Sequence, residues 1–399
     1  MDVMIGLGAA CLLIRLGLVL YRTGLLRAKN AAGAVLRVFA DLCVSTLAFW
    51  AIGAAIMLQS RNGFFGLNPR FIAFSNGGTG SLFFLMTVVL AGTGIVGGAV
   101  AERARFFPLW GASILMSALV IPIGANWAWS GWLAQRGFID AAGGAWLHLS
   151  AAICAATGAI LIGPRTGKYH HDGSASMIPG HNLPLAGVGV AAMLAGWAPY
   201  LVGCLLYTHN ESLVGRAATD ALLAAAAGGL AGLLLGHFRY GKPDVILTLF
   251  GFLGGLVSIA AGAGRVGAPA AVLLGGVAGI IVPLSAVWID LIGRIDDPVG
   301  VIAVHGVGGL WGTLAAGFLT HGTAAHRLWQ TGIQAMGILA IGALSLVLSL
   351  ALFALLKSSV RLRVSETDEF DGLDLAEHDI GAYPDFQQNT IKSYHLREA

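Results

Sequence analysis

Two histidines stand at matching places in the sequence and are the side chains best suited to chemistry. Asp140 precedes His148 by eight residues, and Asp297 precedes His305 by eight, each at the start of an apolar run. An ionisable side chain inside an apolar span is costly, so it usually faces a wet interior and finds a polar partner there. Two imidazoles in contact can share one proton and offer an uncharged polar lining to a small molecule with N–H or O–H groups. The spacing predicts such a pair; a hydrogen-bonded core histidine is the alternative for each residue.

The two aspartates head the runs that carry the histidines. A carboxylate at a helix start can accept hydrogen bonds from free backbone N–H groups and favours the helix dipole. Structural capping is the expectation for Asp297. For Asp140 we also expect a role in shaping the entrance of a pore or orienting its substrate.

Membrane-spanning helices must hold these residues in place. Of 399 residues, 57% are apolar and 11% charged, and the mean hydropathy is +0.79, too apolar for a soluble fold of this length. A hydrocarbon core of about 30 Å needs about 20 apolar residues per helix, and the chain divides into about eleven such runs. The predicted spans are 3–22, 36–58, 80–100, 108–128, 142–163, 183–206, 217–237, 245–264, 268–292, 299–319 and 332–357. The fold class we predict is an all-α membrane protein.

Loop charges predict the orientation of these spans. An odd number of spans places the termini on opposite sides, and cytoplasmic loops carry the excess of Lys and Arg. With the N-terminus outside, thirteen cations lie in the inner loops and the start of the tail: Arg22, Arg27, Lys29, Arg103, Arg105, Arg165, Lys168, Arg239, Lys242, Arg294, Lys357, Arg361 and Arg363. Six lie outside: Arg61, Arg70, Arg136, Arg216, Arg265 and Arg327. We therefore expect the N-terminus outside and the C-terminus in the cytoplasm.

The matched histidines also predict an internal repeat. Residues 1–357 form the predicted transmembrane domain, with halves at about 1–163 and 183–319 and an extra helix at 332–357. Because each half has about five spans, the second half is inverted, an arrangement typical of transporters whose substrate site lies between the halves. Residues 358–399 form a polar, acidic cytoplasmic tail that could dock a partner or cover the pore mouth; a disordered tail is the alternative.

Composition and motifs argue against several other classes of protein. A net charge of +3 and the absence of a long basic run argue against a nucleic-acid partner. No nucleophile, base and orienter set appears, and we expect neither an enzyme nor a cofactor. The four cysteines share no metal-ligand spacing and are expected to be buried small residues: Cys11, Cys43, Cys154 and Cys204. The abundant glycines are expected to serve close helix packing in the bilayer.

Several ordered stretches, taken together, resemble the ammonium transporter family, the Amt/Mep/Rh proteins, and its Amt branch in particular. The resemblance runs from Gly24 to Tyr383. The stretches that carry it are Gly98-Ala99-Val100-Ala101-Glu102-Arg103, Asp140-Ala141-Ala142-Gly143-Gly144, Gly180-His181-Asn182-Leu183-Pro184, Asp296-Asp297-Pro298-Val299-Gly300, His305-Gly306-Val307 and Gly372-Leu373-Asp374-Leu375-Ala376-Glu377-His378.

The resemblance implies a homotrimer in which each subunit has its own narrow hydrophobic pore. His148 and His305 take the places of the family's twin histidines, and Asp140 takes that of its structural aspartate near the recruitment site. An external site would attract ammonium through aromatic faces and a hydroxyl, and the ion would lose its proton before an apolar stretch. The family also implies a PII-type signal protein as a possible partner of the cytoplasmic tail.

The outer half departs from the family pattern. Phe84 fills a gate-region position, but the position of the second gate phenylalanine reads Val88. Trp129 is expected to supply the recruitment tryptophan. Tyr200 stands where a gate phenylalanine is common, and Cys204 where a serine hydroxyl faces the ion. Since a thiol is a weaker acceptor than a hydroxyl, we expect weaker cation capture above an unaltered histidine pair.

The first predicted span contains an arginine that needs a partner. Arg15 would be costly within the first span unless it is paired, and Asp41 in the second span is a candidate partner, with a subunit interface as the alternative.

The leading function is ammonium transport, as ammonium or as ammonia with a separate proton path, across the plasma membrane, here the bacterial inner membrane. The alternatives are an ammonium sensor that signals through the tail and a pore for another small neutral gas or amine.

Overall fold

The described part of the chain is a helical bundle with its long axis along the helices. The computed structural model describes residues 3–58, 64, 66, 79–319 and 321–384. The first half comprises α1 (Val3–Leu25), η1 (Ala28–Asn30), α2 (Ala31–Ala48), η2 (Phe49–Gly53), α3 (Ala54–Met57), α5 (Thr79–Ala99), α6 (Leu109–Leu115), η3 (Met116–Val120), α7 (Ile121–Trp129), α8 (Trp132–Gln135), η4 (Gly144–Leu149) and α9 (Ser150–Ile162). The remainder comprises α10 (Leu183–Tyr207), η5 (Glu211–Leu213), α11 (Val214–Tyr240), α12 (Val245–Ile259), α13 (Ala268–Leu291), η6 (Ile302–Val307), α14 (Gly308–Phe318), α15 (Ala324–Ser359), α16 (Glu366–Asp371) and α17 (Leu373–His378). Within these residues, the extended pairing is limited to two isolated bridges.

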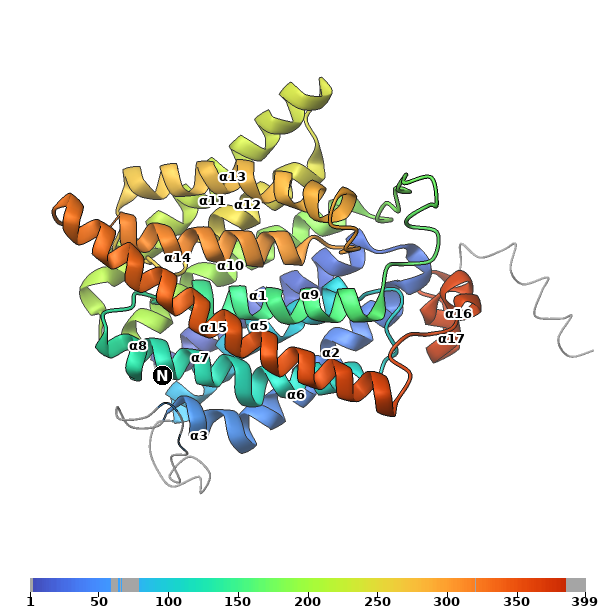
Figure 1. Ribbon diagram of the computed structural model, residues 1–399, viewed down its shortest axis with the longest axis horizontal. Coiled ribbons are helices and arrows are strands. Elements are labelled where there is room, and N and C mark those ends of the chain that lie inside the picture. The colour runs from blue at the N-terminus through green and yellow to red at the C-terminus, as the bar shows by residue number, and fades with distance from the viewer. Residues whose placement is uncertain (1–2, 59–63, 65, 67–78, 320, 385–399) are drawn as a thin grey trace, which may run out of the picture.

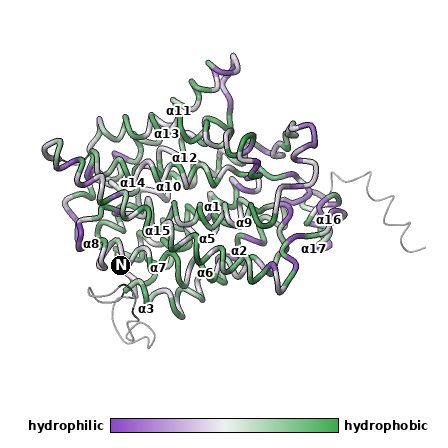
Figure 2. The backbone as a smooth tube through the Cα atoms, in the orientation of Figure 1, coloured by the Kyte–Doolittle hydropathy of each residue, from purple (hydrophilic) through white to green (hydrophobic). Residues whose placement is uncertain are grey.

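The helices match the predicted spans closely. Among the described residues, nine helical stretches are long and apolar enough to cross a membrane, and two further apolar helices, Val245–Ile259 and Ile302–Phe318, are shorter. Figure 2 shows apolar residues along the helices and hydrophilic residues gathered at the two ends of the bundle. The chain is therefore a multi-pass, all-α membrane protein, and the count of eleven spans and their orientation stay predictions.

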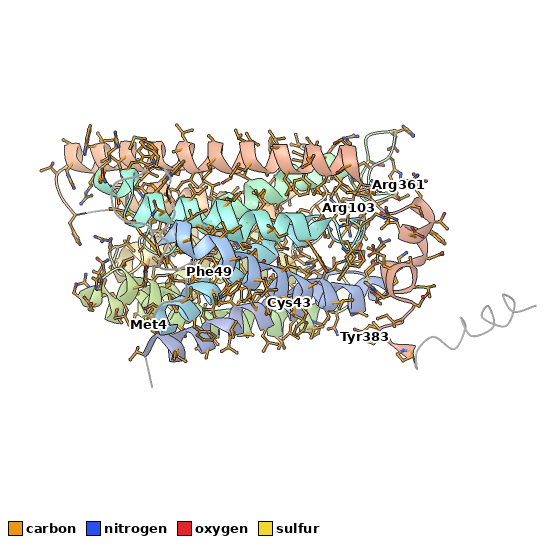
Figure 3. All side chains as sticks on the ribbon, turned by 90° about the horizontal axis from the view of Figure 1, so that it is seen from below. Met4, Cys43, Phe49, Arg103, Arg361 and Tyr383 are labelled. Atoms are coloured by element: carbon orange, nitrogen blue, oxygen red, sulfur yellow. The ribbon has the colours of Figure 1, made fainter. Side chains whose placement is uncertain are left out.

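The two ends of the chain lie at opposite ends of the bundle. Figure 1 shows the N-terminal end of α1 at one end and α16 and α17 at the other. Figure 3 shows the same separation, with Met4 at one end and Arg361 and Tyr383 at the other. This placement is what an odd number of spans would produce.

Two predicted span limits differ from the structure for identifiable reasons. The eighth span was predicted to reach residue 264, but α12 ends at Ile259. The carbonyls of Ala260 and Ala261 instead accept the N–H groups of Ala142 and Ala141, at 3.1 and 3.0 Å. The last span begins before residue 332, because the Thr323 hydroxyl accepts from the His326 N–H at 3.3 Å and caps α15.

Glycines bring helix backbones into contact, as expected. A Cβ added to Gly17 of α1 would lie 2.4 Å from the carbonyl oxygen of Gly189 in α10. A Cβ on Gly228 of α11 would lie 2.3 Å from the carbonyl of Gly251 in α12. Without a hydrophobic drive between helices in lipid, such close packing stabilises the bundle, and neither position leaves room for a larger residue.

Arg15 finds its partner within the chain. Its Nη1 lies 2.7 Å from the Asp41 Oδ2, and its side chain also donates to the carbonyls of Leu90 and Val38. The predicted pairing between the first two spans is thus present. The expectation of four buried cysteines is wrong for Cys43, which is exposed on α2.

The described part of the tail folds onto the bundle. Ser365 and Asp368 form a capping box that begins α16. The Asp374 carboxylate accepts from the N–H groups of Ala32 and Gly33, at 2.9 and 2.6 Å, at the N-terminus of α2. The Glu369 carboxylate accepts from Thr166. A wholly disordered tail is therefore the wrong alternative for residues 366–378, and residues 385–399 lie outside the described part.

Candidate pore and its histidine pair

The structure brings the two histidines together between the halves of the chain. His148 lies in η4 and His305 in η6, two matching π-helical turns. Their Nδ1 atoms are 3.1 Å apart, and the rings, with centroids 5.1 Å apart, are tilted by 17°. Of two neutral imidazole nitrogens in such contact, one donates and the other accepts, so the pair holds one proton between its Nδ1 atoms.

A repeated turn sets both histidines in place. Gly143 has a φ of +85° and Gly300 a φ of +70°, each three residues after its aspartate. This left-handed conformation is open to glycine without strain and turns the chain back over the carboxylate. The sequence spacing Asp-x-x-Gly was visible, but its meaning as a turn was not predicted. The histidine follows five residues later in both halves.

The two carboxylates cap the π-turns to different extents. Asp140 accepts from the N–H groups of Gly144, Ala145 and Trp146, at 2.6, 2.8 and 3.1 Å. Asp297 accepts from the Ile302 N–H at 2.7 Å and, weakly, from Val299 at 3.4 Å. Capping was the expectation for both. Asp140 is only 3% exposed, and its carboxylate is bonded to the backbone of the turn that leads to His148.

The histidines border a narrow apolar cavity. Its lining comes from α1, α5, η4, α10, α12 and the η6 region: Ile14, Leu18, Tyr21, Ala91, Ile95, His148, Met193, Trp197, Tyr200, Leu253, Val257, Val299, Val301, Val304 and His305. The Nε2 atom of His148 is buried and has no hydrogen-bond partner among the described residues. A buried ring nitrogen at the border of an apolar cavity can donate to or accept from a small polar molecule.

Aromatic rings of α10 flank His148. Trp197, which the sequence interpretation missed, stacks on the imidazole with centroids 5.4 Å apart and planes within 5°. Tyr200 meets it edge-on at 6.4 Å, and its hydroxyl donates to the Ala142 carbonyl. Tyr200 was predicted in the gate region and lies beside the histidine pair. The spacing of Trp197, Tyr200, Cys204 and Tyr207 along one helix face is the signal that could have grouped them.

Three further predicted site residues lie inside the bundle. Phe84, Val88 and Cys204 are all fully buried. The Phe84 ring packs so closely on α10 that a Cβ on Gly203 would lie 2.2 Å from it. The structure therefore places these three side chains in a packed layer.

Trp129 lies beside the Asp140 turn. Its indole N–H donates to the carbonyls of Asp140 and Ala141, at 3.3 and 3.2 Å. Its ring packs on Trp146, 4.9 Å between centroids, and on Tyr207 at 5.5 Å. Tyr207 is a further aromatic residue that the sequence interpretation did not single out.

Comparison with known proteins identifies the family. Residues 3–383 match the model of the Ammonium Transporter Family. The chain belongs to the ammonium transporter family. It is 33% identical to "Ammonium transporter Amt2" of Archaeoglobus fulgidus, over 95% of this chain and 87% of that protein. It is 31% identical to "Ammonium transporter Amt2" of Haloferax mediterranei, over 93% and 86%.

Solved structures agree with this membership. The "Sensor Amt Protein" is 32% identical to this chain and superposes with a TM-score of 0.87. The match covers 94% of this chain and 97% of that protein. The crystal structure of Candida albicans Mep2 is 25% identical, with a TM-score of 0.80 and coverage of 96% of this chain and 90% of that one. The arrangement of helices is therefore that of the family over nearly the whole chain.

In this member of the family, a second cavity lies beside the turn that leads to His305. It contains about 1590 Å³ of empty space and is bordered by Asp297, Gly300 and Ala303. Val299, Val301 and Val304 line the histidine cavity instead. The turn from Asp297 into η6 therefore forms the partition between the two cavities.

A buried ion-pair network at Asp296 holds the start of this turn in place. Arg165 donates to both oxygens of Asp296, at 2.8 and 2.9 Å, and to Glu102 at 2.8 Å. Arg103 donates to the backbone carbonyl of Asp296 at 2.7 Å. Burial acts to raise the pKa of Asp296, but hydrogen bonds from Arg165 and the charges of Arg165 and Arg103 outweigh it and lower the pKa to about 2. The carboxylate thus stays charged and joined to the loops of the first half.

Proposed function

We propose that this chain transports ammonium across the membrane, with one hydrophobic pore in each subunit. The observation that carries the proposal is the His148–His305 pair at the border of an apolar cavity, with a buried histidine nitrogen left unpaired among the described residues. Membership in the ammonium transporter family and relatives that are named transporters support it. On this proposal the chain is not an enzyme and needs no cofactor.

The cavity sets the form in which the substrate crosses. A bare cation pays a large desolvation penalty between aliphatic walls, whereas neutral ammonia pays much less. Ammonium would be captured outside, near Trp129, and would lose its proton before passing the layer of Phe84 and Val88. Ammonia could then donate to or accept from the histidine pair, which carries the proton separately along its shared hydrogen bond.

The outer capture site is the part of the proposal that departs from the family pattern. Cys204 offers a thiol in place of a hydroxyl, so less of the ion's hydration is replaced. Trp129 and Tyr207 pack on each other, and aromatic faces suit a cation. We infer lower affinity for ammonium than a serine-containing relative would have.

Assembly and location follow from the same proposal. We infer a homotrimer in the bacterial inner membrane, with the inverted halves 1–163 and 183–319 around each pore and the tail, residues 358–399, in the cytoplasm. A PII-type signal protein is a candidate partner of that tail.

A second candidate function is ammonium sensing through the tail. The observation that favours it is the docked tail, in which Asp374 caps α2 and Glu369 binds Thr166. A solved relative at 32% identity is named "Sensor Amt Protein". A pore for another small neutral gas or amine is the remaining alternative.

The test is an ammonium pulse on purified protein in liposomes, with current and pH recorded together. Transport predicts a current in the unmodified protein and its loss in His148→Ala and His305→Asp. His237→Ala, which alters an exposed histidine at the end of α11, is the matched control and should conduct normally. Ammonium binding without flux would exclude transport and favour the sensor. Uptake of methylamine without ammonium-driven current would favour the neutral pore.

A further inference from the structure

One face of α15 carries two buried glutamines and a glycine. Gln330, Gln334 and Gly337 stand at positions i, i+4 and i+7, so they share one side of the helix. Gln334 is fully buried and Gln330 is only 7% exposed. A primary amide buried inside a membrane protein is costly unless its groups are hydrogen-bonded. Since α15 lies outside the two predicted halves, this polar face needs a partner within one of them.

That partner is the backbone of Ile139, the residue before Asp140. The Gln334 Oε1 accepts from the Ile139 N–H at 2.8 Å, and the Gln334 Nε2 donates to the Ile139 carbonyl at 2.6 Å. A neighbouring β-strand would supply the same two bonds to one residue. The amide therefore fixes both the position and the rotation of the backbone just before the turn that leads to His148.

The same face of α15 also holds the two residues before Ile139. The Gln330 Nε2 donates to the Gly137 carbonyl at 2.7 Å. The Phe138 ring occupies the space over Gly337, where an added Cβ would lie 2.2 Å from it. Residues 137–139, which we call the strap, are thus bound to α15 at three consecutive positions.

Gln334 connects the strap to α14, the helix that follows the His305 turn. Its Nε2 donates a second hydrogen bond to the Thr313 carbonyl, at 3.0 Å. Thr313 packs on the start of η4, because a Cβ added to Gly144 would lie 2.6 Å from the Thr313 Oγ1. The Gly144 N–H in turn donates to the Asp140 carboxylate at 2.6 Å. These contacts close a ring around the turn that leads into η4.

A primary amide is the group that fits all three bonds of Gln334. Its oxygen faces one N–H group and its nitrogen faces two carbonyls, so the hydrogen-bond network sets the orientation of the amide. A glutamate would place a carboxylate oxygen against the carbonyls of Ile139 and Thr313. An apolar side chain would remove the partners of both backbone groups of Ile139. The position is therefore specific for this side chain.

Both halves of the chain hold the residue before the capping aspartate by its carbonyl. In the second half, the Asp296 carbonyl accepts from the Arg103 guanidinium at 2.7 Å. In the first half, the Ile139 carbonyl accepts from the Gln334 amide at 2.6 Å. Because each turn presents one histidine of the pair, these two clamps together set the distance between the imidazoles.

We propose that Gln334 is a positioning residue of the pore, which holds the His148 imidazole where it can share a proton with His305. Gln334 is absent from the described lining of the histidine cavity, so it acts through the strap and the Asp140 turn. The inference rests on the proposed function, since the shared proton serves the passage of ammonium. A misplacement of about 1 Å can lower the rate of a positioned reaction by about 100-fold.

Solid-state NMR of the full-length protein in liposomes, with isotope-labelled histidine, tests the positioning. A correlation signal between two ring nitrogens, assigned by its absence in His305→Asp, reports the Nδ1 atoms that lie 3.1 Å apart. Gln334→Met keeps the length of the side chain without its hydrogen bonds. We expect it to lose this signal and to lower the ammonium current about tenfold or more. Ser349→Ala, which removes a buried 3.0 Å bond from α15 to Thr157, should keep both.

The signal and the current separate this inference from the proposed function. A signal without current in the unmodified protein contradicts transport, and the signal of Gln334→Met then decides the positioning alone. An unchanged signal in Gln334→Met overturns the inference, as does a signal lost with the current unchanged, an equal loss in Ser349→Ala, or no signal in the unmodified protein. If Gln334→Met does not fold, Gln334→Asn replaces it, because its amide is too short to reach both Ile139 and Thr313; an unchanged signal there overturns the inference.

Discussion

Replacing the two capping aspartates by asparagine should separate their contributions. Asparagine keeps the size of the side chain and one acceptor oxygen but removes the charge and the second acceptor. At Asp140, both oxygens serve N–H groups at 2.6 to 3.1 Å. At Asp297, one strong bond of 2.7 Å is joined by a weak one of 3.4 Å. The change should therefore be costlier at Asp140.

The expected magnitudes follow from the number of bonds lost. A hydrogen bond to a charged group contributes about 1.5 to 3 kcal/mol, and a buried donor left unpaired costs about 1 to 3 kcal/mol. Asp140→Asn leaves at least one of the Gly144, Ala145 and Trp146 N–H groups without its charged acceptor, and the amide turns an N–H towards another donor. We expect a loss of about 3 to 4 kcal/mol for Asp140→Asn and about 1 to 2 kcal/mol for Asp297→Asn.

The measurement is the free energy of unfolding in mixed micelles, by denaturant titration followed by tryptophan fluorescence. The unmodified protein and Asp371→Asn, an exposed aspartate of the tail, serve as references. The ammonium-pulse current adds a second measurement, because η4 positions His148. Equal destabilisation by the two variants, or a larger loss for Asp297→Asn, would refute the reasoning from bond counts.

Three further predictions rest on contacts elsewhere in the structure. The pKa of Asp296 is about 2 in the folded protein, against 3.8 for an aspartate free of such contacts. A depressed pKa stabilises the fold above pH 4 by about 2 kcal/mol. This stabilisation should be lost as the pH falls from about 4 to about 2. Unfolding measured across that range should show a smaller pH dependence in Asp296→Asn, and an equal dependence would contradict the assignment. Tyr200→Phe, which removes the bond to the Ala142 carbonyl, should cost about 1 kcal/mol of stability and lower the ammonium current; an unchanged current would show that this bond does not position His148. Asp374→Ala should release α17 from α2 and make the tail cleavable by limited proteolysis, whereas Asp371→Ala should not; equal resistance of the two variants would argue against the cap.

Hydropathy and residue spacing predicted the features that depend on single spans or on long ordered motifs. The runs of apolar residues located the helices because the bilayer requires backbone hydrogen bonds to be satisfied within each span. The eight-residue spacing located His148 and His305, which the structure brings to 3.1 Å. The cost of a buried charge identified Arg15 and Asp41 as partners, since few carboxylates were within reach.

Features that depend on the direction of a side chain could not be predicted in the same way. Lipid is as apolar as the interior of the bundle, so hydropathy does not tell which face of a membrane helix points inward. Cys11 and Cys43 both lie in apolar runs, yet the first is 1% exposed and the second faces outward. The same lack of an inward signal left Trp197 unrecognised and gave no indication that Tyr200 lies edge-on to His148.

Contacts between distant segments were equally invisible in the sequence. The tail reaches back over more than 300 positions to α2, where Asp374 and Glu377 bind residues 32, 33 and 37. Acidic composition suggested a solvated or docking tail, but composition does not identify the surface that a tail contacts. The contacted groups are the free N–H groups of a helix start and a buried arginine, and both come together only when the helices are assembled.

The matched turns show how equivalent sequence signals lead to unequal sites. Both halves use an aspartate, a glycine with positive φ and a π-turn to present a histidine, so the backbone device is the same. Its surroundings differ. His148 is stacked on Trp197 and its aspartate is fully bonded, whereas the Asp297 turn borders the second cavity. Since the Asp297 turn has fewer bonds and more free space, a rearrangement of the pair is expected to move His305 rather than His148, and the ion pairs of Asp296 are what limit that movement.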